Sequence, residues 1–240
     1  VYKRQGIAAG SDASDMWSSA GFVPVGDNAN RFSGQLDGAQ HVVNGLTING
    51  GNLTDTGLFG YTSSTSVISN IGLEGGSVRS AATQVGSLVG TNLGSIRNAW
   101  SSARVQGDQS VGGLVGTNWG SVVSSYASGT VTGDGSGTGG LVGSNAYGTI
   151  YSAYATGSVS GGSVTGGLVG LNSGTLDNVY ASGQVVSNSL NNVGGLFGMS
   201  VDGSIRNAYW DADSTGRGIS GSNAGSLVQA TAINSSNRYS

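Results

Sequence analysis

The amino-acid sequence predicts an all-β fold, a parallel β-solenoid in which each coil takes about 27 residues and three short strands. A recurring tetrapeptide, further residue types in the same register and an unusual glycine content favour this fold. The tetrapeptide is Gly-Leu-Val-Gly or a close variant, and its copies begin 26 to 30 residues apart, at Gly57, Ser87, Gly113, Gly140, Gly167 and Gly195. Such a period is typical of stacked repeats and is too short for the four-stranded blades of a propeller.

Each unit continues in the same order after the tetrapeptide. An asparagine follows, at Asn92, Asn118, Asn145 and Asn172, with Ser200 in the last unit. After a glycine and a hydroxyl residue comes an aliphatic residue, at Ile96, Val122, Ile150, Leu176 and Ile205. Four positions later there is an aromatic residue, at Trp100, Tyr126, Tyr154, Tyr180 and Tyr209. A valine closes the unit, at Val105, Val131, Val159 and Val185. These residues favour strands, and the Gly, Asn and Ser between them favour corners.

Glycine accounts for 46 of the 240 residues, and there is one proline, Pro24. In regular elements these glycines would cost about 23–46 kcal/mol, at roughly 0.5–1 kcal/mol each, more than the usual net stability of roughly 5–15 kcal/mol. Most glycines are therefore expected at corners of positive φ or facing an interior too narrow for a Cβ atom. Collagen is excluded because glycine does not recur at every third position.

The recurring asparagines and aromatic residues each predict a column along the solenoid axis. Coils stack about 4.8 Å apart, so the amides of Asn92, Asn118, Asn145 and Asn172 are expected to form a hydrogen-bonded structural ladder. The aromatic column, Trp100 to Tyr209, is expected to stack, with a sugar-binding platform as the alternative.

Strict alternation along each strand predicts which side chains face solvent. It places three columns on one face: the aliphatic column, the Asn or Ser two positions after each aliphatic residue, and the aromatic column. The candidate exposed face then consists of Arg97, Val123, Tyr151, Asp177 and Arg206. A kink at the column of small residues that includes Ala99 would upset this assignment.

The chain divides into four parts by composition and register. Residues 1–20 are expected to be an irregular start, and the first five resemble non-native translated adapter sequence. Residues 21–56 are expected to form a divergent first coil or cap, because an end coil needs covering. Residues 57–215 hold five to six coils, and residues 216–240 form an irregular tail or the start of a missing coil.

Charge and composition exclude several classes of protein. The formal net charge is −3, which gives nucleic acid and anionic lipid surfaces little reason to bind. There is no cysteine, so disulfides, thiolate zinc sites and cysteine nucleophiles are excluded. The longest apolar run is far shorter than the roughly 20 residues that span a bilayer, so no membrane insertion is expected.

The sequence offers few groups for catalysis or metal binding, and we expect neither an enzyme nor a cofactor. The lone histidine, His41, is expected on the surface. Asp177 and Asp202 lie in adjacent units at different columns, and Asp211 with Asp213 reads as solvated charge more readily than as a cation site. The segment 134–137 lacks the spaced acids of a calcium loop, and the glycine pairs lack a P-loop lysine.

The repeats resemble the GLUG motif, named for Gly-Leu-aliphatic-Gly, of large secreted bacterial surface proteins such as filamentous-haemagglutinin-like adhesins and of non-catalytic regions of some immunoglobulin-degrading peptidases. The resemblance covers about residues 57–210, and residues 32–48 are similar to the segment that leads into such repeats. It implies an internal fragment of a secreted or cell-surface protein. It implies no peptidase activity, because the sequence has no His-Glu-x-x-His.

The leading hypothesis is a non-enzymatic rod segment of a bacterial surface adhesin that exposes a regular face to a glycan or protein receptor and spaces other domains from the cell. One alternative is a polysaccharide-processing β-solenoid enzyme, which needs two carboxylates about 5–10 Å apart. Another is ice binding through a flat hydroxyl face formed by Ser102, Ser128, Thr156 and Ser182. An uncapped end would favour end-to-end self-association.

Overall fold

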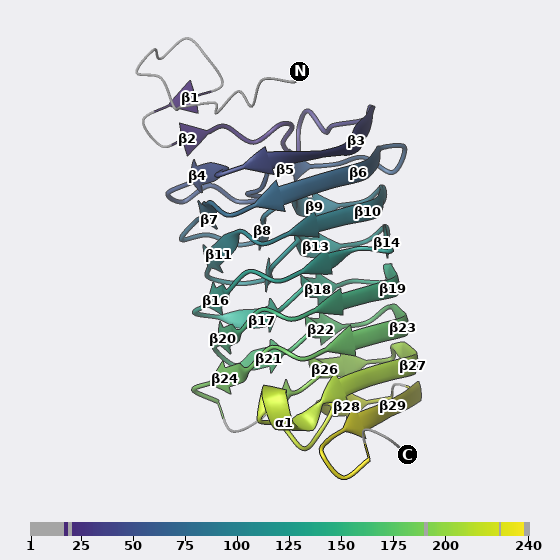
Figure 1. Ribbon diagram of the computed structural model, residues 1–240. Coiled ribbons are helices and arrows are strands. Elements are labelled where there is room, and N and C mark those ends of the chain that lie inside the picture. The colour runs from purple at the N-terminus through teal and green to yellow at the C-terminus, as the bar shows by residue number, and fades with distance from the viewer. Residues whose placement is uncertain (1–16, 19–20, 190–191, 226, 238–240) are drawn as a thin grey trace.

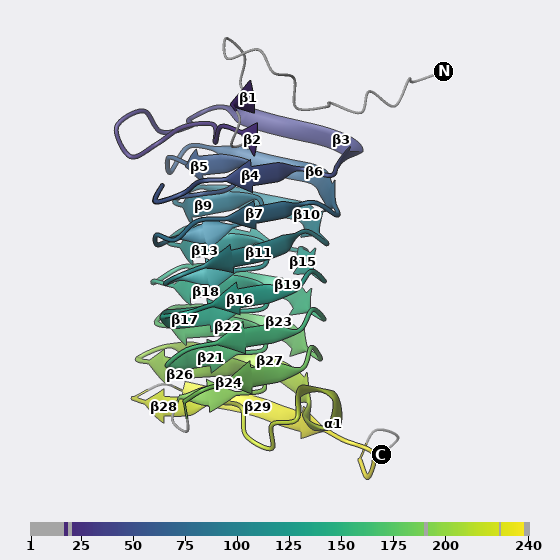
Figure 2. The ribbon, with the colours of Figure 1, turned by 90° about the vertical axis from the view of Figure 1, so that its left-hand side faces the viewer.

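The computed structural model describes residues 17–18, 21–189, 192–225 and 227–237. It is a parallel β-solenoid of about seven turns, which confirms the predicted fold class. The coils stack along one axis, so strands about 27 residues apart in the sequence lie side by side (Figures 1 and 2). The expected irregular start at residues 1–20, with its first five residues, falls almost entirely outside the described residues.

Each coil runs through four strand segments, and equivalent segments pair from coil to coil to form four sheets. Sheet 1 has the longest strands: β3 (Gln35–Asn44), β6 (Val67–Glu74), β10 (Ser95–Ser101), β14 (Ser121–Val123) with β15 (Tyr126–Ala127), β19 (Thr149–Ala155), β23 (Thr175–Ala181), β27 (Ser204–Asp211) and β29 (Leu227–Ile233). Sheet 2 consists of β1 (Trp17–Ser18), β2 (Gly21–Phe22), β4 (Thr47–Asn49), β7 (Ser77–Arg79), β11 (Arg104–Gly107), β16 (Val131–Gly133), β20 (Val159–Gly161) and β24 (Val185–Ser187).

The other two sheets flank the recurring tetrapeptide. Sheet 3 consists of β8 (Val85–Gly86), β12 (Val111–Gly112), β17 (Ser136–Gly139), β21 (Val164–Gly166) and β25 (Val193–Gly194). Sheet 4 consists of β5 (Phe59–Tyr61), β9 (Val89–Asn92), β13 (Val115–Asn118), β18 (Val142–Asn145), β22 (Val169–Asn172), β26 (Phe197–Val201) and β28 (Ser222–Ala224). Sheet 3 is a segment beyond the predicted three, and its strands are too short to show an alternating pattern in the sequence.

The core is a set of files of buried side chains that run along the axis. The leucine of each tetrapeptide from the second copy onward is fully buried. The Leu114 N–H donates to the Leu141 carbonyl at 2.9 Å, and the Leu141 N–H donates to the Leu168 carbonyl at 2.8 Å. Equivalent residues therefore lie one above another at strand separation, as the repeat predicted.

The glycine just before the tetrapeptide allows the backbones of sheets 3 and 4 to approach closely. A Cβ atom on Gly112 would lie 2.1 Å from the Val115 carbonyl oxygen, and the equivalent atom on Gly139 would lie 2.1 Å from that of Val142. Of the glycines described between residues 77 and 215, only Gly137 has a positive φ. Most repeat glycines are thus required by the narrow interior, one of the two reasons expected from composition.

The left-handed positions of sheet 1 correct the predicted alternation. One residue in each of the six coils from β6 to β27 has a φ of 47° to 56° in sheet 1, and these residues are Asn70, Asn98, Ser124, Ser152, Asn178 and Asn207. This single left-handed residue rotates the remainder of the strand, so the next residue, such as Ala99, turns inward and is buried. The aromatic residue after it points outward. The prediction that the aliphatic, Asn/Ser and aromatic columns share one face is therefore wrong, because it required every residue to be extended.

The two ends of the solenoid differ from the middle. Residues 21–56 make a first coil in which β3 pairs with β6 and β4 with β7, and β2 adds an antiparallel strand to β4. After β27, a short helix, α1 (Ala212–Thr215), is capped by the Asp211 side chain. The described part of residues 216–240 then starts a further coil, because β28 pairs with β26 and β29 with β27.

Candidate functional site

The outer surface of sheet 1 carries a column of aromatic side chains, one from each of five successive coils. Register pairs bring the aromatic column together, and its members are Trp100, Tyr126, Tyr154, Tyr180 and Tyr209. All five are half-buried or exposed, and Tyr154 is 40% exposed. The face therefore offers ring surface to solvent.

Three of these rings form a stack. The Trp100 and Tyr126 rings are 5.8 Å apart at an angle of 5°, and the Tyr126 and Tyr154 rings are 4.7 Å apart at 4°. Parallel rings at this separation lie face to face, so each ring covers its neighbour. Burial, and then the neighbouring Tyr126 phenol, raise the pKa of the Tyr154 hydroxyl, so it stays protonated at neutral pH.

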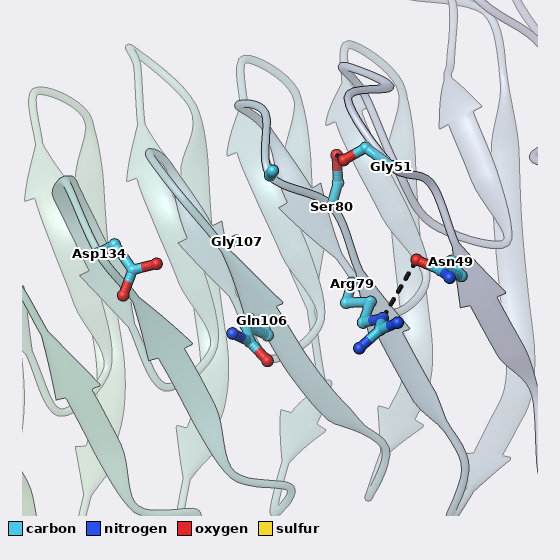
Figure 3. Close-up of a pocket in the computed structure, with 8 residues that line it drawn as sticks. Asn49, Gly51, Arg79, Ser80, Gln106, Gly107 and Asp134 are labelled. Carbon is cyan, nitrogen blue, oxygen red and sulfur yellow. Dashed lines mark hydrogen bonds between the residues drawn. The ribbon is translucent and has the colours of Figure 1, made fainter.

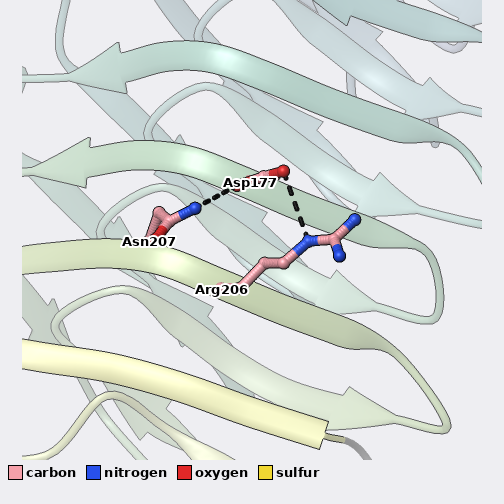
Figure 4. A network of polar contacts seen from close by, with 3 residues as sticks. All are labelled: Asp177, Arg206 and Asn207. Atoms are coloured by element: carbon pink, nitrogen blue, oxygen red, sulfur yellow. Dashed lines mark hydrogen bonds and ion pairs between the residues drawn. The ribbon is translucent and has the colours of Figure 1, made fainter.

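The candidate exposed face forms a second column on the same surface. Arg97, Tyr151 and Arg206 are exposed, whereas Val123 and Asp177 are half-buried. Arg206 Nε lies 3.3 Å from one carboxylate oxygen of Asp177 (Figure 4). The other oxygen of this carboxylate accepts a 2.9 Å hydrogen bond from the Asn207 side-chain amide. Because Arg206 is largely solvated, this ion pair contributes about 0–1 kcal/mol.

A groove of about 490 Å³ lies at the amino-terminal end of the aromatic column, and we call it the Trp100 groove. Its walls come from four consecutive coils of sheet 1. They are Gln40, Val42, Asn70, Ile71, Gly72, Asn98, Ala99, Trp100, Ser124 and Tyr126. None of these side chains is charged.

A chain of hydrogen bonds holds the polar side of the Trp100 groove. The Asn98 side-chain amide donates to the side-chain oxygen of Asn70 at 3.1 Å, and the Asn70 side-chain amide donates to the Asp37 carboxylate at 2.9 Å. The bond from Asn70, followed by one from the Ala39 N–H, lowers the pKa of Asp37, which is therefore ionised at neutral pH. The carboxylate fixes the direction of both amides.

Sheet 2 carries a second groove of about 290 Å³, whose lining, unlike that of the Trp100 groove, includes charged side chains (Figure 3). Arg79 and Asp134 are its charged residues, and the Arg79 Nε–H donates to the Asn49 side-chain oxygen at 3.1 Å. Its lining has one carboxylate, whereas hydrolysis of glycosidic bonds generally uses two. This geometry gives no support to the polysaccharide-processing alternative.

The asparagine column lies inside the solenoid. Its amides form a continuous chain: Asn92 donates to Asn118 at 2.8 Å, Asn118 to Asn145 at 2.9 Å, Asn145 to Asn172 at 2.8 Å, and Asn172 to the Ser200 hydroxyl at 3.0 Å. All four asparagines are fully buried. No ligand reaches this column from solvent, so its role is to join the coils.

The remaining candidates are separated from one another. His41 is exposed on β3, with Nδ1 2.8 Å from the Gly38 oxygen. Asp202 is exposed between β26 and β27, while Asp177 is held by Arg206. Asp211 caps α1 through bonds from the Asp213 and Ser214 N–H groups. In the described ranges, no three His, Cys, Asp or Glu side chains are grouped to hold a metal ion.

The hydroxyl column proposed for ice binding runs along a corner. Ser102, Ser128, Thr156 and Ser182 stack between the strands of sheet 1 and sheet 2, and each N–H donates to the preceding coil. A single file at a corner does not make the flat face that ice binding needs. The Trp100 groove was not predicted as such, because it depends on Gly72 breaking the aromatic column and on an insertion in β3.

The comparison with protein families bears on the repeats themselves. Residues 107–132 and 134–160 each match the family described as the GLUG motif. These two segments are GLUG motif repeats. These two matches cover consecutive coils of the solenoid, and the wider resemblance over residues 57–210 rests on the register of the columns.

Two relatives match part of this chain in sequence. A protein named as a glycine-rich membrane protein from Evansella cellulosilytica is 40% identical over 80 residues, which are 32% of this chain and 9% of that protein. Halomucin from Haloquadratum walsbyi is 34% identical over 106 residues, which are 42% of this chain and 1% of halomucin. The chain thus spans a small part of the length of both relatives.

The GLUG solenoid is also similar to a solved structure. A crystal structure of a Bacteroides ovatus protein, named as an immunoglobulin A1 protease, superimposes with a TM-score of 0.63, covering 82% of this chain and 69% of that one. The identity is 20%, so the likeness shows the fold alone. Within the part of the chain that the structure describes, no helix has the length and apolar character of a membrane span.

Proposed function

We propose that this chain is a non-enzymatic rod segment of a secreted or surface-attached bacterial protein, which spaces other domains from the cell and binds glycans or proteins through the outer surface of sheet 1. The observation that carries the proposal is the aromatic column, which continues from coil to coil on a face that no element of the described residues covers. The names of the two relatives support a surface location.

The rod geometry supports the spacing role. Each coil adds about 4.8 Å along the axis, and parallel pairing holds each coil to the next. Additional repeats would lengthen such a segment without changing the surface it presents. The interior columns of leucine and asparagine make the segment stiff, since every coil is hydrogen-bonded on both sides in the middle of the stack.

Binding is proposed for sheet 1 because of the contrast with sheet 2. Tyr151 and Tyr154 are 47% and 40% exposed on sheet 1, and exposed rings of this kind are enriched in binding surfaces. The outward side chains described in sheet 2, such as Arg104 and Gln106, are mostly polar and include no aromatic ring.

Cell adhesion tests this role. The chain is displayed on a carrier cell, and attachment to surfaces coated with polysaccharides, mucins or matrix proteins is counted. We expect attachment to at least one surface, reduced severalfold by Tyr151→Ser with Tyr154→Ser, and unchanged by the matched sheet 2 pair Arg104→Ser with Gln106→Ser. Attachment that is indifferent to the sheet 1 pair, or absent on every surface, would overturn the binding role.

A further inference from the structure

The first ring of the aromatic column is stacked on another ring on one side only. Trp100 is stacked on Tyr126, and its partners on the other side are Gly72 in β6 and Val42 in β3. Neither of those residues has a ring. A Cβ atom on Gly72 would lie 2.4 Å from the indole, so the half-buried indole packs over this glycine and lines the Trp100 groove with its remaining surface.

An insertion in β3 builds the opposite wall. The register between β3 and β6 shifts between Asp37 and His41, and Ala39 and Gln40 have positive φ values of 48° and 63°. Bulges of this kind redirect side chains. Here the bulge brings the Gln40 amide beside Val42 at the mouth of the groove.

The lining selects a ligand that is uncharged, rich in hydroxyl groups and apolar on one face. Asn70, Asn98 and Gln40 supply amide groups, while the indole and Val42 supply apolar surface. The Asn70 and Asn98 amides each use one of their two donor hydrogens in the chain from Asp37, which leaves one donor hydrogen on each for a ligand. The hydrogen-bond chain from Asp37 keeps two of the amides oriented in advance, which lowers the entropy lost on binding.

A peptide fits this groove less well. The strands β6 and β10 are paired on both sides, so their backbone groups are already used. β3 is the end strand of sheet 1, and the edge that it leaves open faces away from β6 and from the rest of the groove, so an added chain would not run through the groove. A sugar ring needs no backbone partner, because its C–H face packs on an aromatic ring and its hydroxyl groups bind amides.

We propose that the Trp100 groove binds a neutral glycan, with one pyranose ring packed against the part of the Trp100 indole that lines the groove and its hydroxyl groups hydrogen-bonded to the amides of Asn70, Asn98 and Gln40. From Val42 to Tyr126 the groove spans three strand spacings, about 14 Å, which accommodates about three sugar residues along the axis. This inference rests on the proposed binding role of sheet 1 and narrows it to one site and one ligand class.

The test is titration of the chain with neutral oligosaccharides of glucose, mannose, galactose and N-acetylglucosamine, three to six residues long, followed by calorimetry and by NMR of the indole and side-chain amides. We expect at least one oligosaccharide to bind and to shift the Trp100 Nε1–H together with the Asn70 and Asn98 amides. Trp100→Ala is expected to weaken binding about tenfold or more, and Trp100→Phe, which keeps a ring face, to weaken it less.

Tyr147→Ala is the matched control, since Tyr147 is an exposed aromatic residue between β18 and β19 that belongs neither to the aromatic column nor to the groove. It is expected to leave the affinity unchanged, and urea unfolding of each variant checks that the fold is intact. No binding by any neutral oligosaccharide, tighter binding of acidic oligosaccharides or peptides, or equal loss in Trp100→Ala and Tyr147→Ala would overturn the site. If cell attachment persists in Trp100→Ala, the site is wrong while the binding role of sheet 1 stands.

Discussion

Thr138 carries an unusual buried hydroxyl group. Among the buried side chains that the structure describes, its Oγ1 alone has no hydrogen-bond partner. Its register partner in the preceding coil is Val111, so the site already accepts valine in a neighbouring coil. We expect Thr138→Val to raise the free energy of unfolding by about 1 kcal/mol or more, because an unpaired buried hydroxyl costs roughly 1–3 kcal/mol.

Urea unfolding measures this effect, and Thr165→Val is the matched control. Thr165 is the next residue in the same column and its hydroxyl donates to the Gly162 oxygen at 3.4 Å, so its replacement removes a partner as well as a polar group. A Thr138→Val chain no more stable than the Thr165→Val chain would contradict this account of the column.

The inner amide ladder predicts an opposite effect at Asn145. Its side chain accepts from Asn118 and donates to Asn172, and all three are fully buried. Asn145→Ala leaves a donor and an acceptor unpaired in the core, so we expect a loss of about 2–4 kcal/mol. Arg97→Ala, on the exposed face, is expected to change the unfolding free energy by less than about 0.5 kcal/mol. Equal effects of the two substitutions in urea unfolding would show that the ladder adds no stability.

At the scale of the strands and corners, the tetrapeptide predicts that glycine is needed for space and not for its φ angle. A Cβ atom on Gly140 would lie 2.1 Å from the Gly167 oxygen and 2.9 Å from the Ala155 Cβ. We expect Gly140→Ala to separate two coils locally and to destabilise the chain by more than about 3 kcal/mol.

Gly218→Ala is the control for this substitution, because a Cβ atom there meets nothing within 4 Å and the φ angle is not positive. Circular dichroism during thermal unfolding compares the two chains. A Gly140→Ala chain that melts at the temperature of the Gly218→Ala chain would show that the interior has room for side chains.

The columns of each element were predictable from the sequence because every coil repeats the same contacts. Leucine recurs in the tetrapeptide because it is buried in each coil from the second copy onward, and asparagine recurs after it because its amide pairs with the equivalent side chain of the next coil. The outward turn of the aromatic column was missed, since alternation treats every residue as extended. The signal was present: Asn98 and its equivalents are Asn or Ser, and Asn is a residue that tolerates left-handed backbone.

At the scale of the whole molecule, the sequence predicted the stack but not where its surface is interrupted. The Trp100 groove exists because one coil has Gly72 where the next has an aromatic residue, and because β3 contains an insertion. Such departures from a repeat are single events, and their neighbours are known only once the coils are in register.

End-to-end self-association would depend on the strand edges at the two ends of the stack, and it stays a prediction. Arg217 Nε donates to the Val185 oxygen at 3.2 Å, which uses an acceptor on the last strand of sheet 2. In sheet 1, β29 is the last described strand and pairs with β27 on one side.

Stacking in register is the central claim, and distances between spin labels test it most directly. Asp37, Ser69, Arg97, Val123, Tyr151, Asp177 and Arg206 are equivalent positions in successive coils of sheet 1. With one label at Arg206 and the other at Arg97, Ser69 or Asp37, pulsed electron paramagnetic resonance should give distances that grow by about 5 Å for each coil, from about 19 Å to about 29 Å between backbones. Distances that do not rise in equal steps would contradict the stack and the binding face built on it.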